Sequence, residues 1–151
     1  MALCLVALLL AGCGPDVPLT VGSAAPRLDL ALLDGEPWAP EPGPVLVNFW
    51  ATWCMSCKVA LPELRHLAET GAVDVVGLAL DSDVDKVKGF AAQNGIAYPL
   101  ALDDTAVLGQ FGGLNIPHSV LLDADGRVLA IYRGTVRRQE VLDDLQQAGA
   151  S

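Results

Sequence analysis

The segment Val45-Leu46-Val47-Asn48-Phe49-Trp50-Ala51-Thr52-Trp53-Cys54-Met55-Ser56-Cys57 decides how this chain folds. Its first six residues are apolar enough for a central β-strand that is covered on both faces. A helical pattern follows from residue 58 to Thr70, so the two cysteines stand at a helix start. There the helix dipole and the unpaired amide donors favour the thiolate of the first cysteine, which is the form that attacks disulfides. The segment therefore predicts thiol–disulfide exchange.

Length and charge limit the classes of protein to consider. The chain has 151 residues, which suits one domain, and 52% of them are hydrophobic, which is enough for a well-filled core. The formal net charge is −9. No basic surface is available for phosphates, so we do not expect nucleic acid as a partner.

The N-terminus has the composition of an export signal. Residues 1–12 carry no charged side chain and are shorter than the roughly 20 residues that span a bilayer. They end in Leu10-Ala11-Gly12-Cys13, which resembles the bacterial lipobox, so we expect cleavage before Cys13 and lipid on its sulfur. Residues 13–21 would be a tether and residues 22–151 the folded domain. The alternative is a buried N-terminal strand or helix. No Lys or Arg precedes the apolar run, so the true start would lie upstream.

The cysteine count supports a reactive pair. With Cys4 removed and Cys13 lipidated, Cys54 and Cys57 are the remaining thiols, whereas a secreted disulfide scaffold needs more bridges. The same spacing forms half of a zinc site, but no second CxxC or histidine pair completes one. We therefore expect no metal and no cofactor.

Strand patterns recur along the chain. Besides residues 45–50, strands are expected at 73–80, 98–102, 119–123 and 127–132. Asp123-Ala124-Asp125-Gly126 joins the last two as a β-hairpin. Alternation over 27–32 before Asp34-Gly35 predicts a further hairpin near the N-terminus.

Helix patterns separate most of these strands. Helices are expected at 54–70, from Ser82 or Asp83 to about Asn94, at 104–111, and from a Thr135 cap to the C-terminus. The first should bend at Pro62 and end at Gly71. The order β-α-β-α-β-α-β-β-α predicts an α/β fold with a mixed sheet between helices.

Residues 49–54, the CxxC, Pro62, Ile116-Pro117 and the hairpin at 123–127 together resemble the thioredoxin superfamily. The tether, the N-terminal hairpin and the segment near 83–102 resemble its membrane-tethered TlpA/ResA branch. The resemblance covers roughly residues 22–148. It implies a three-layer thioredoxin-like fold and protein-disulfide reductase activity.

Roles for individual residues follow from this chemistry and from the resemblance. Cys54, expected to be exposed, attacks, and Cys57 resolves the mixed disulfide. Trp53 is expected to shield one side of the pair and to offer an apolar docking surface; simple core packing is the alternative, and the two are compatible. The resemblance implies a cis peptide bond before Pro117 and backbone pairing of substrate with Ile116.

The chain also departs from its family. Asn48 stands where thioredoxin has a buried Asp, and Ala60 where ResA-type proteins have a Glu, so neither carboxylate can move a proton. Met55-Ser56 between the cysteines sets how well the helix start stabilises the thiolate. His118 either faces the cysteines and assists the chemistry or is an uninvolved strand-end histidine.

Three functions remain in competition. The first is a lipid-anchored, monomeric reductase in the bacterial envelope, facing the periplasm or the outer side of the membrane. It would draw electrons from a membrane thiol relay and reduce protein disulfides, such as apocytochrome c in cytochrome c maturation or copper-site cysteines. The second is a dithiol oxidase or isomerase. The third is a Cu(I) delivery module with soft ligands from Cys54, Met55, Cys57 and His118.

Overall fold

The protein is described here by a computed structural model, which places residues 18–150. The strands are β1 (Val45–Trp50), β2 (Asp74–Ala79), β3 (Leu100–Leu102), β4 (His118–Leu122) and β5 (Val128–Arg133). The helices are α1 (Met55–Thr70), α2 (Val84–Gln93), α3 (Ala106–Gln110) and α4 (Arg138–Gly149). The element order is the one that the sequence predicts.

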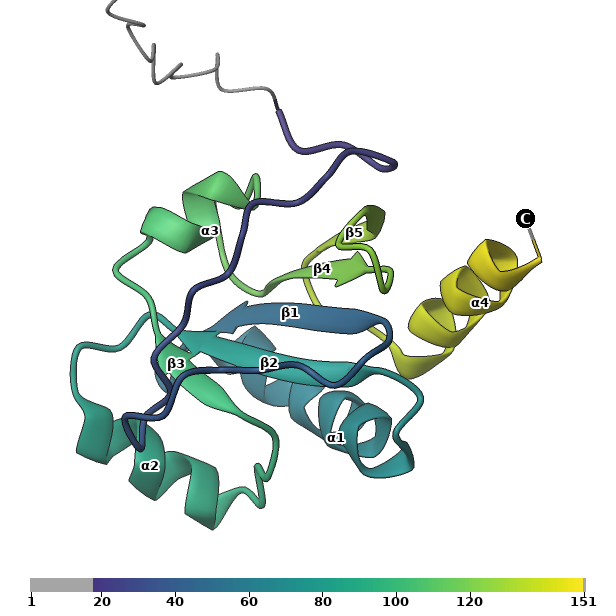
Figure 1. Cartoon of the computed structure of the whole chain (residues 1–151). Helices are drawn as coiled ribbons and strands as arrows, with labels where there is room; N and C mark the ends of the chain where they lie inside the picture. The colour runs from purple at the N-terminus through teal and green to yellow at the C-terminus, as the bar shows by residue number, and fades with distance from the viewer. Residues whose placement is uncertain (1–17, 151) are drawn as a thin grey trace, which may run out of the picture.

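The strands form one mixed sheet in the order β3-β2-β1-β4-β5 (Figure 1). β1 pairs in parallel with β2 and β2 with β3, whereas β4 runs antiparallel to both β1 and β5. β1 lies at the centre, and all six of its residues are buried. The predicted α/β three-layer fold with a mixed central sheet is confirmed.

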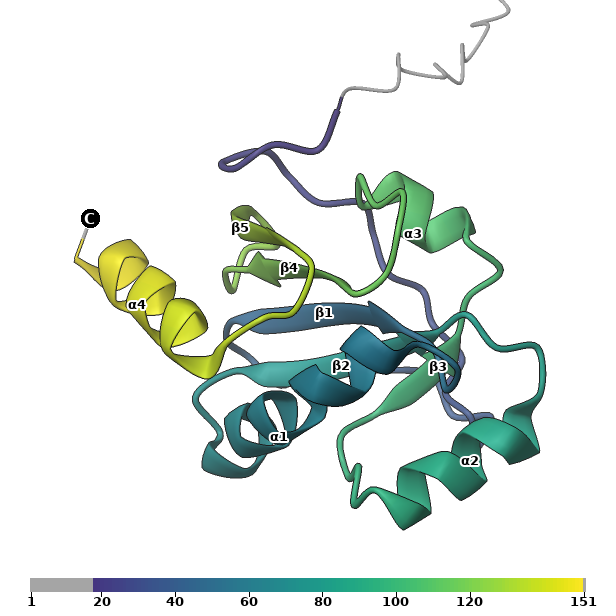
Figure 2. The same ribbon diagram turned by 180° about the vertical axis from the view of Figure 1, so that it is seen from behind.

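Two apolar clusters fill the spaces on the two faces of the sheet. One contains residues of α1, α2 and α4, and both cysteines belong to it. The other lies under α3 and the N-terminal segment (Figures 1 and 2). Because side chains alternate along β1, Leu46 and Trp50 face the first cluster and Val47 and Phe49 face the second.

Helix α1 has the boundaries that its sequence predicts. Cys54 is its N-cap residue, and Gly71 ends it in the left-handed conformation at φ 66°. Pro62 lies inside the helix. Its buried face includes Leu61, Leu64 and Leu67, which hold the helix against the sheet.

The last helix begins later than predicted. Thr135 is not its cap, because Arg137 occupies the N-cap position. The backbone N–H of Arg137 lies 3.4 Å from Glu140 Oε2, and that of Arg138 donates to Glu63 Oε2 on α1 at 3.0 Å. Carboxylates thus satisfy the free amides at this helix start, and one of them links α4 to α1.

Two other expectations change in detail. The N-terminal segment turns at Asp34-Gly35, but its arms meet only through an isolated bridge between Ala31 and Pro37. β3 is shorter than predicted and begins after Pro99, which has no N–H to donate to a neighbouring strand.

The expected signal at 1–12 and lipidated Cys13 lie outside the described residues, as does most of the tether. Among residues 18–150, no helix combines the length and apolar character that crossing a membrane requires.

We predict that Gly77→Ala lowers the free energy of unfolding by about 1–3 kcal/mol, because overpacking a buried site forces its neighbours to move. A Cβ atom at Gly77 would lie 2.7 Å from Leu100 Cδ2 and 3.0 Å from Trp50 Nε1. Urea unfolding of the full chain measures the change. Gly89→Ala is the control: no atom lies within 4 Å of its added Cβ in α2, so it should stabilise by roughly 0.5–1 kcal/mol. Equal stability of the Gly77 variant and the parent would contradict the packing described here.

Candidate active site

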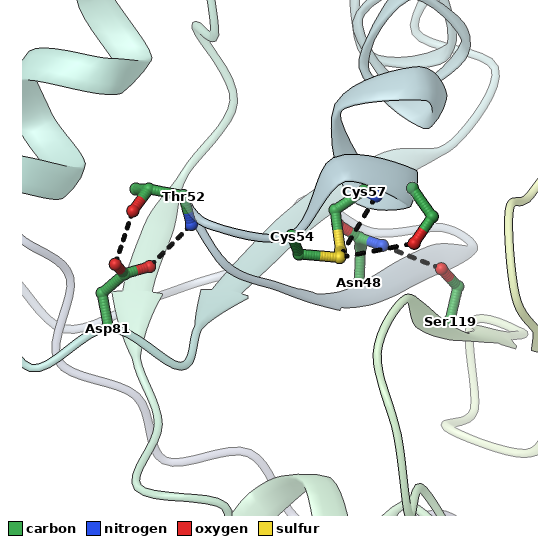
Figure 3. Close-up of a disulfide and its surroundings, with 7 residues drawn as sticks. Asn48, Thr52, Cys54, Cys57, Asp81 and Ser119 are labelled. Carbon is green, nitrogen blue, oxygen red and sulfur yellow. Dashed lines mark hydrogen bonds between the residues drawn. A yellow bond between two sulfur atoms is a disulfide. The ribbon is translucent and has the colours of Figure 1, made fainter.

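The two motif cysteines form a disulfide at the start of α1 (Figure 3). Their sulfur atoms are 2.17 Å apart and their Cα atoms 5.3 Å apart. Cys54 is 7% exposed and Cys57 2% exposed. The expectation of an exposed Cys54 is wrong for this closed pair, because both side chains pack into the apolar cluster beneath α1. Cys54 is still the more accessible of the two.

The start of α1 surrounds the Cys54 sulfur with donors. The backbone N–H of Cys57 donates to Cys54 Sγ at 3.2 Å, and the Ser56 hydroxyl lies 3.6 Å from the same sulfur. The first turn of α1 contains no acidic residue, so no carboxylate there offsets the positive end of the helix dipole. Once the disulfide is reduced, these groups favour a thiolate on Cys54.

A buried carboxylate anchors the loop that leads into the disulfide. Asp81 Oδ2 accepts from the backbone N–H of Thr52 at 2.8 Å, and its Oδ1 accepts from the Thr52 hydroxyl at 2.6 Å (Figure 3). Lys86 Nζ lies 3.1 Å from Asp81 Oδ1. Burial raises the pKa of Asp81, but the bonds from Thr52 and the charge of Lys86 outweigh it, so its pKa lies below the ordinary value. The charged form therefore holds Thr52 in place.

Sequence patterns alone did not assign this role to Asp81. The available signal was its position directly after an apolar strand. Parallel β1 and β2 end at the same edge of the sheet, so the residues that follow them, Thr52 and Asp81, meet there.

The loop before β4 supplies the second wall of the site. The Ile116–Pro117 peptide bond is cis, as the family resemblance predicts. Ile116 and Pro117 line a surface hollow together with Leu114 and Arg133. Within residues 18–150, the backbone of Ile116 makes no hydrogen bond to another backbone group.

Large apolar side chains around the start of α1 and in the loop before β4 are open to solvent. Trp53 is 63% exposed, Met55 72% and Leu114 93%. The core-packing interpretation of Trp53 is therefore wrong. Val59, one turn beyond Met55 on α1, is also exposed. We call Trp53, Met55, Val59 and Leu114 the apolar rim.

Asn48 lies on the face of β1 that carries the disulfide. Leu46 and Trp50, two residues to either side, both belong to the cluster that contains the cysteines. Asn48 Nδ2 donates to Ser119 Oγ on β4 at 3.0 Å, and both side chains are buried. Figure 3 shows the Asn48 amide behind the disulfide, with its nitrogen turned toward Ser119.

His118 lies on the other face of the sheet. It pairs with Phe49 across β1 and β4, and its ring centroid lies 5.9 Å from that of Phe49. Its Nε2 is 2.9 Å from the carbonyl oxygen of Phe111. Burial lowers the pKa of His118, with a smaller contribution from the charge of Arg133, and the Phe111 carbonyl opposes this shift. The hypothesis that His118 faces the cysteines is therefore wrong, because strand alternation points it away.

The soft ligands proposed for Cu(I) are not brought together. The His118 ring is directed to Phe111 and the Met55 side chain to solvent. Within the described part of the chain, no group of three or more His, Cys, Asp and Glu side chains is arranged to hold a metal ion.

Comparison with known proteins places these features in context. A family model described as Redoxin matches residues 20–148. The chain is 26% identical over 134 residues to thioredoxin-like protein YneN of Bacillus subtilis, which covers 83% of this chain and 79% of YneN. It is 32% identical over 102 residues to thiol-disulfide oxidoreductase ResA of Bacillus anthracis, covering 64% of this chain and 58% of ResA. The match thus spans less than two thirds of the ResA length.

A further relative and two solved structures are also similar to this chain. Thiol:disulfide interchange protein HelX of Rhodobacter capsulatus is 33% identical over 116 residues, covering 76% of this chain and 61% of HelX. A putative thiol:disulfide interchange protein DsbE from Chlorobium tepidum superposes with a TM-score of 0.73 at 27% identity, covering 87% of this chain and 97% of that one. StoA of Bacillus subtilis gives 0.68 at 21% identity, covering 82% and 99%, which shows a common fold.

We predict that Asp81→Asn lowers the free energy of unfolding by about 1–3 kcal/mol at pH 7, because a charged hydrogen-bond acceptor is lost from a buried site. The folded pKa of Asp81 is depressed, so its contribution is complete above the unfolded value of 3.8 and is lost as the pH falls through the folded value. The difference between parent and variant should therefore shrink in acid. Urea titrations across pH measure it. Asp125→Asn, at an exposed hairpin position, should change stability by less than about 0.5 kcal/mol. A pH-independent difference would contradict the role given to the carboxylate.

Proposed function

Because the chain belongs to the Redoxin family, we propose that its Cys54–Cys57 pair reduces disulfide bonds in other proteins of the bacterial cell envelope. The protein is a TlpA/ResA-like member of the thioredoxin superfamily and a thiol–disulfide oxidoreductase. The single observation that carries the proposal is the position of Cys54, whose sulfur accepts an amide hydrogen bond at the start of α1.

The reaction proceeds in two exchanges that conserve electrons. The Cys54 thiolate of the reduced protein attacks one sulfur of a substrate disulfide, which forms a mixed disulfide and releases one substrate thiolate. Cys57 then loses its proton and attacks Cys54 Sγ, which closes the Cys54–Cys57 bond and releases the second substrate thiolate. Two electrons pass from the cysteine pair to the substrate, whose thiolates take up protons.

The burial of the pair fits this order of attack. Cys54 is the more exposed sulfur and receives the amide hydrogen bond, so it suits the attacking role. Cys57 is almost fully enclosed, and its sulfur is bonded to that of Cys54. The roles of Cys54 and Cys57 follow from this difference in access.

The surroundings suit an extended protein segment as the substrate. The apolar rim offers area that loses water on binding. The unpaired backbone of Ile116 offers main-chain hydrogen bonds beside the cis-Pro117 turn. An unfolded segment around a cysteine pair, such as that of an apocytochrome c or a copper-site protein, has apolar side chains for the rim and a free backbone for Ile116.

The location follows from the lipobox-like sequence. Lipid on Cys13 would hold the domain at the membrane, facing the periplasm or the outer side, as a monomer on its tether. After each turnover the disulfide must be reduced again, and a membrane thiol relay would deliver those electrons. The names of the ResA and HelX relatives support the thiol–disulfide exchange proposed for this domain.

The reverse reaction is the second candidate. The same pair, if it were kept oxidised, would accept electrons from reduced peptides and act as an oxidase or isomerase. The geometry of the pair allows this direction as well, because the closed Cys54–Cys57 disulfide is the form that an oxidase carries into its reaction.

We predict that Cys57→Ser accumulates mixed disulfides with envelope proteins, because the attacking sulfur remains and the resolving one is gone. The adducts are recovered from envelope extracts of cells that make the full chain, and dithiothreitol should release the partners for identification. Cys54→Ser is the matched control and should trap few. Equal trapping by the two variants would overturn the assignment of attacker and resolver.

We also predict that the Cys54–Cys57 pair is mostly reduced in growing cells, because the electron donor of a reductase keeps its cysteines in the dithiol form. Acid quenching, alkylation and mass spectrometry of the peptide with both cysteines measure the fraction, and Cys4 and Cys13 do not contribute to it. A pair that is mostly oxidised in untreated cells would support the oxidase candidate and sink the reductase.

A further inference from the structure

A hydrogen-bond acceptor is buried beside the disulfide without a donor. Asn48 is 1% exposed and its Nδ2 is bound to Ser119, but its Oδ1 has no partner among residues 18–150. In the described range, the other buried side-chain atoms without a hydrogen-bond partner are Trp38 Nε1, Trp50 Nε1, Arg65 Nε and the Tyr98 hydroxyl. Those atoms can all donate, so Asn48 Oδ1 is the only member of the group that solely accepts. A buried acceptor of this kind is costly unless a donor reaches it in another state of the protein.

The fold fixes where this oxygen points. Asn48 projects from β1 toward the start of α1, between the side chains of Leu46 and Trp50, which pack with both cysteines. Ser119 lies directly opposite on β4 and binds the nitrogen side of the amide. The oxygen therefore occupies the side of the amide turned away from Ser119, and the amide as a whole lies behind the disulfide in Figure 3.

A donor appears at this place when the disulfide is reduced. Reduction breaks the S–S bond with two electrons, and a sulfur that takes up a proton becomes an S–H donor. Cys54 already has donors directed at its sulfur, which suits the thiolate. Cys57 is the more deeply buried cysteine, and within residues 18–150 its sulfur receives no hydrogen bond, which suits the protonated thiol.

We propose that Asn48 Oδ1 accepts a hydrogen bond from the Cys57 thiol in the reduced protein. The inference rests on the proposed function only in requiring that the pair cycle between disulfide and dithiol. Asn48 then has a partner in the reduced state and none in the oxidised state, so it shifts the equilibrium toward the dithiol. It makes the disulfide easier to reduce and makes the reduced protein a milder reductant.

This role differs from that of a base. A carboxamide does not take the Cys57 proton, and it holds that proton on the sulfur until a mixed disulfide forms at Cys54. In the observed orientation the Asn48 N–H group donates to Ser119 Oγ, which leaves Oδ1 as the free acceptor of the amide.

The test measures the reduction potential of the full-length protein and of Asn48→Leu, which has similar volume and no acceptor. Both are equilibrated with dithiothreitol redox buffers, and the peptide that carries Cys54 and Cys57 is quantified by alkylation and mass spectrometry. We expect the equilibrium constant for reduction to fall about tenfold in the variant, which is a potential about 30 mV more negative. Asn48→Ala, which also lacks the acceptor, should shift the potential in the same direction.

Val47→Ala is the matched control for a merely structural effect. Val47 is adjacent on β1 and equally buried, but it faces the opposite apolar cluster. It should weaken the oxidised and reduced forms alike and leave the potential unchanged. Urea unfolding of the oxidised and reduced forms completes a thermodynamic cycle with the reduction potential. Only the Asn48 variants should change the difference in unfolding free energy between the two forms.

The outcomes separate the two proposals. If the parent pair equilibrates with the buffer and both Asn48 variants leave its reduction potential unchanged or make it less negative, the role of Asn48 is overturned. The proposed oxidoreductase function then still stands. Failure of the parent pair to equilibrate with the redox buffer overturns the proposed function, and the Asn48 inference with it.

Discussion

The hydrogen bond from the Cys57 N–H to the Cys54 sulfur is the interaction on which the rest of the site depends. It exists because Cys54 occupies the N-cap of α1, where a helix leaves amide donors without intrahelical partners. An N-cap hydroxyl oxygen accepts such a bond and stays protonated, whereas a thiol in the same position can ionise, and the bond then stabilises the thiolate. The same backbone geometry that starts the helix therefore also creates the nucleophile.

The surrounding fold keeps this sulfur at the helix start. β1 is buried over its whole length and delivers the loop to the end of the sheet, where Asp81 holds Thr52 by two hydrogen bonds. The cis-Pro117 turn leads into the neighbouring strand β4. Backbone, carboxylate and proline thus come from segments distant in sequence and meet at one edge of the sheet, and the apolar rim leaves the approach open to a protein substrate.

Local patterns predicted much of this arrangement. The apolar run, the CxxC and the Gly71 stop define a strand, a reactive turn and a helix without long-range information. The family resemblance added the cis-Pro117 bond, which the X–Pro sequence alone does not favour.

What the sequence did not predict depends on strand register and on distant partners. The direction of His118 follows from its pairing with Phe49, and register is invisible before the sheet is assembled. Asp81 reaches Thr52 across 29 positions, and the amide of Arg138 on α4 donates to Glu63 on α1. The local sequence around each carboxylate does not identify these distant partners.

The central claim is that the start of α1 holds the sulfur of residue 54 ionised, and alkylation kinetics of the reduced full-length protein test it directly. The rate of iodoacetamide modification at each cysteine is followed against pH by mass spectrometry, with a free cysteine peptide as reference. Cys54 should react faster than the peptide at neutral pH and keep its rate at acidic pH where the peptide becomes unreactive. A Cys54 rate that matches the peptide at every pH would contradict the account.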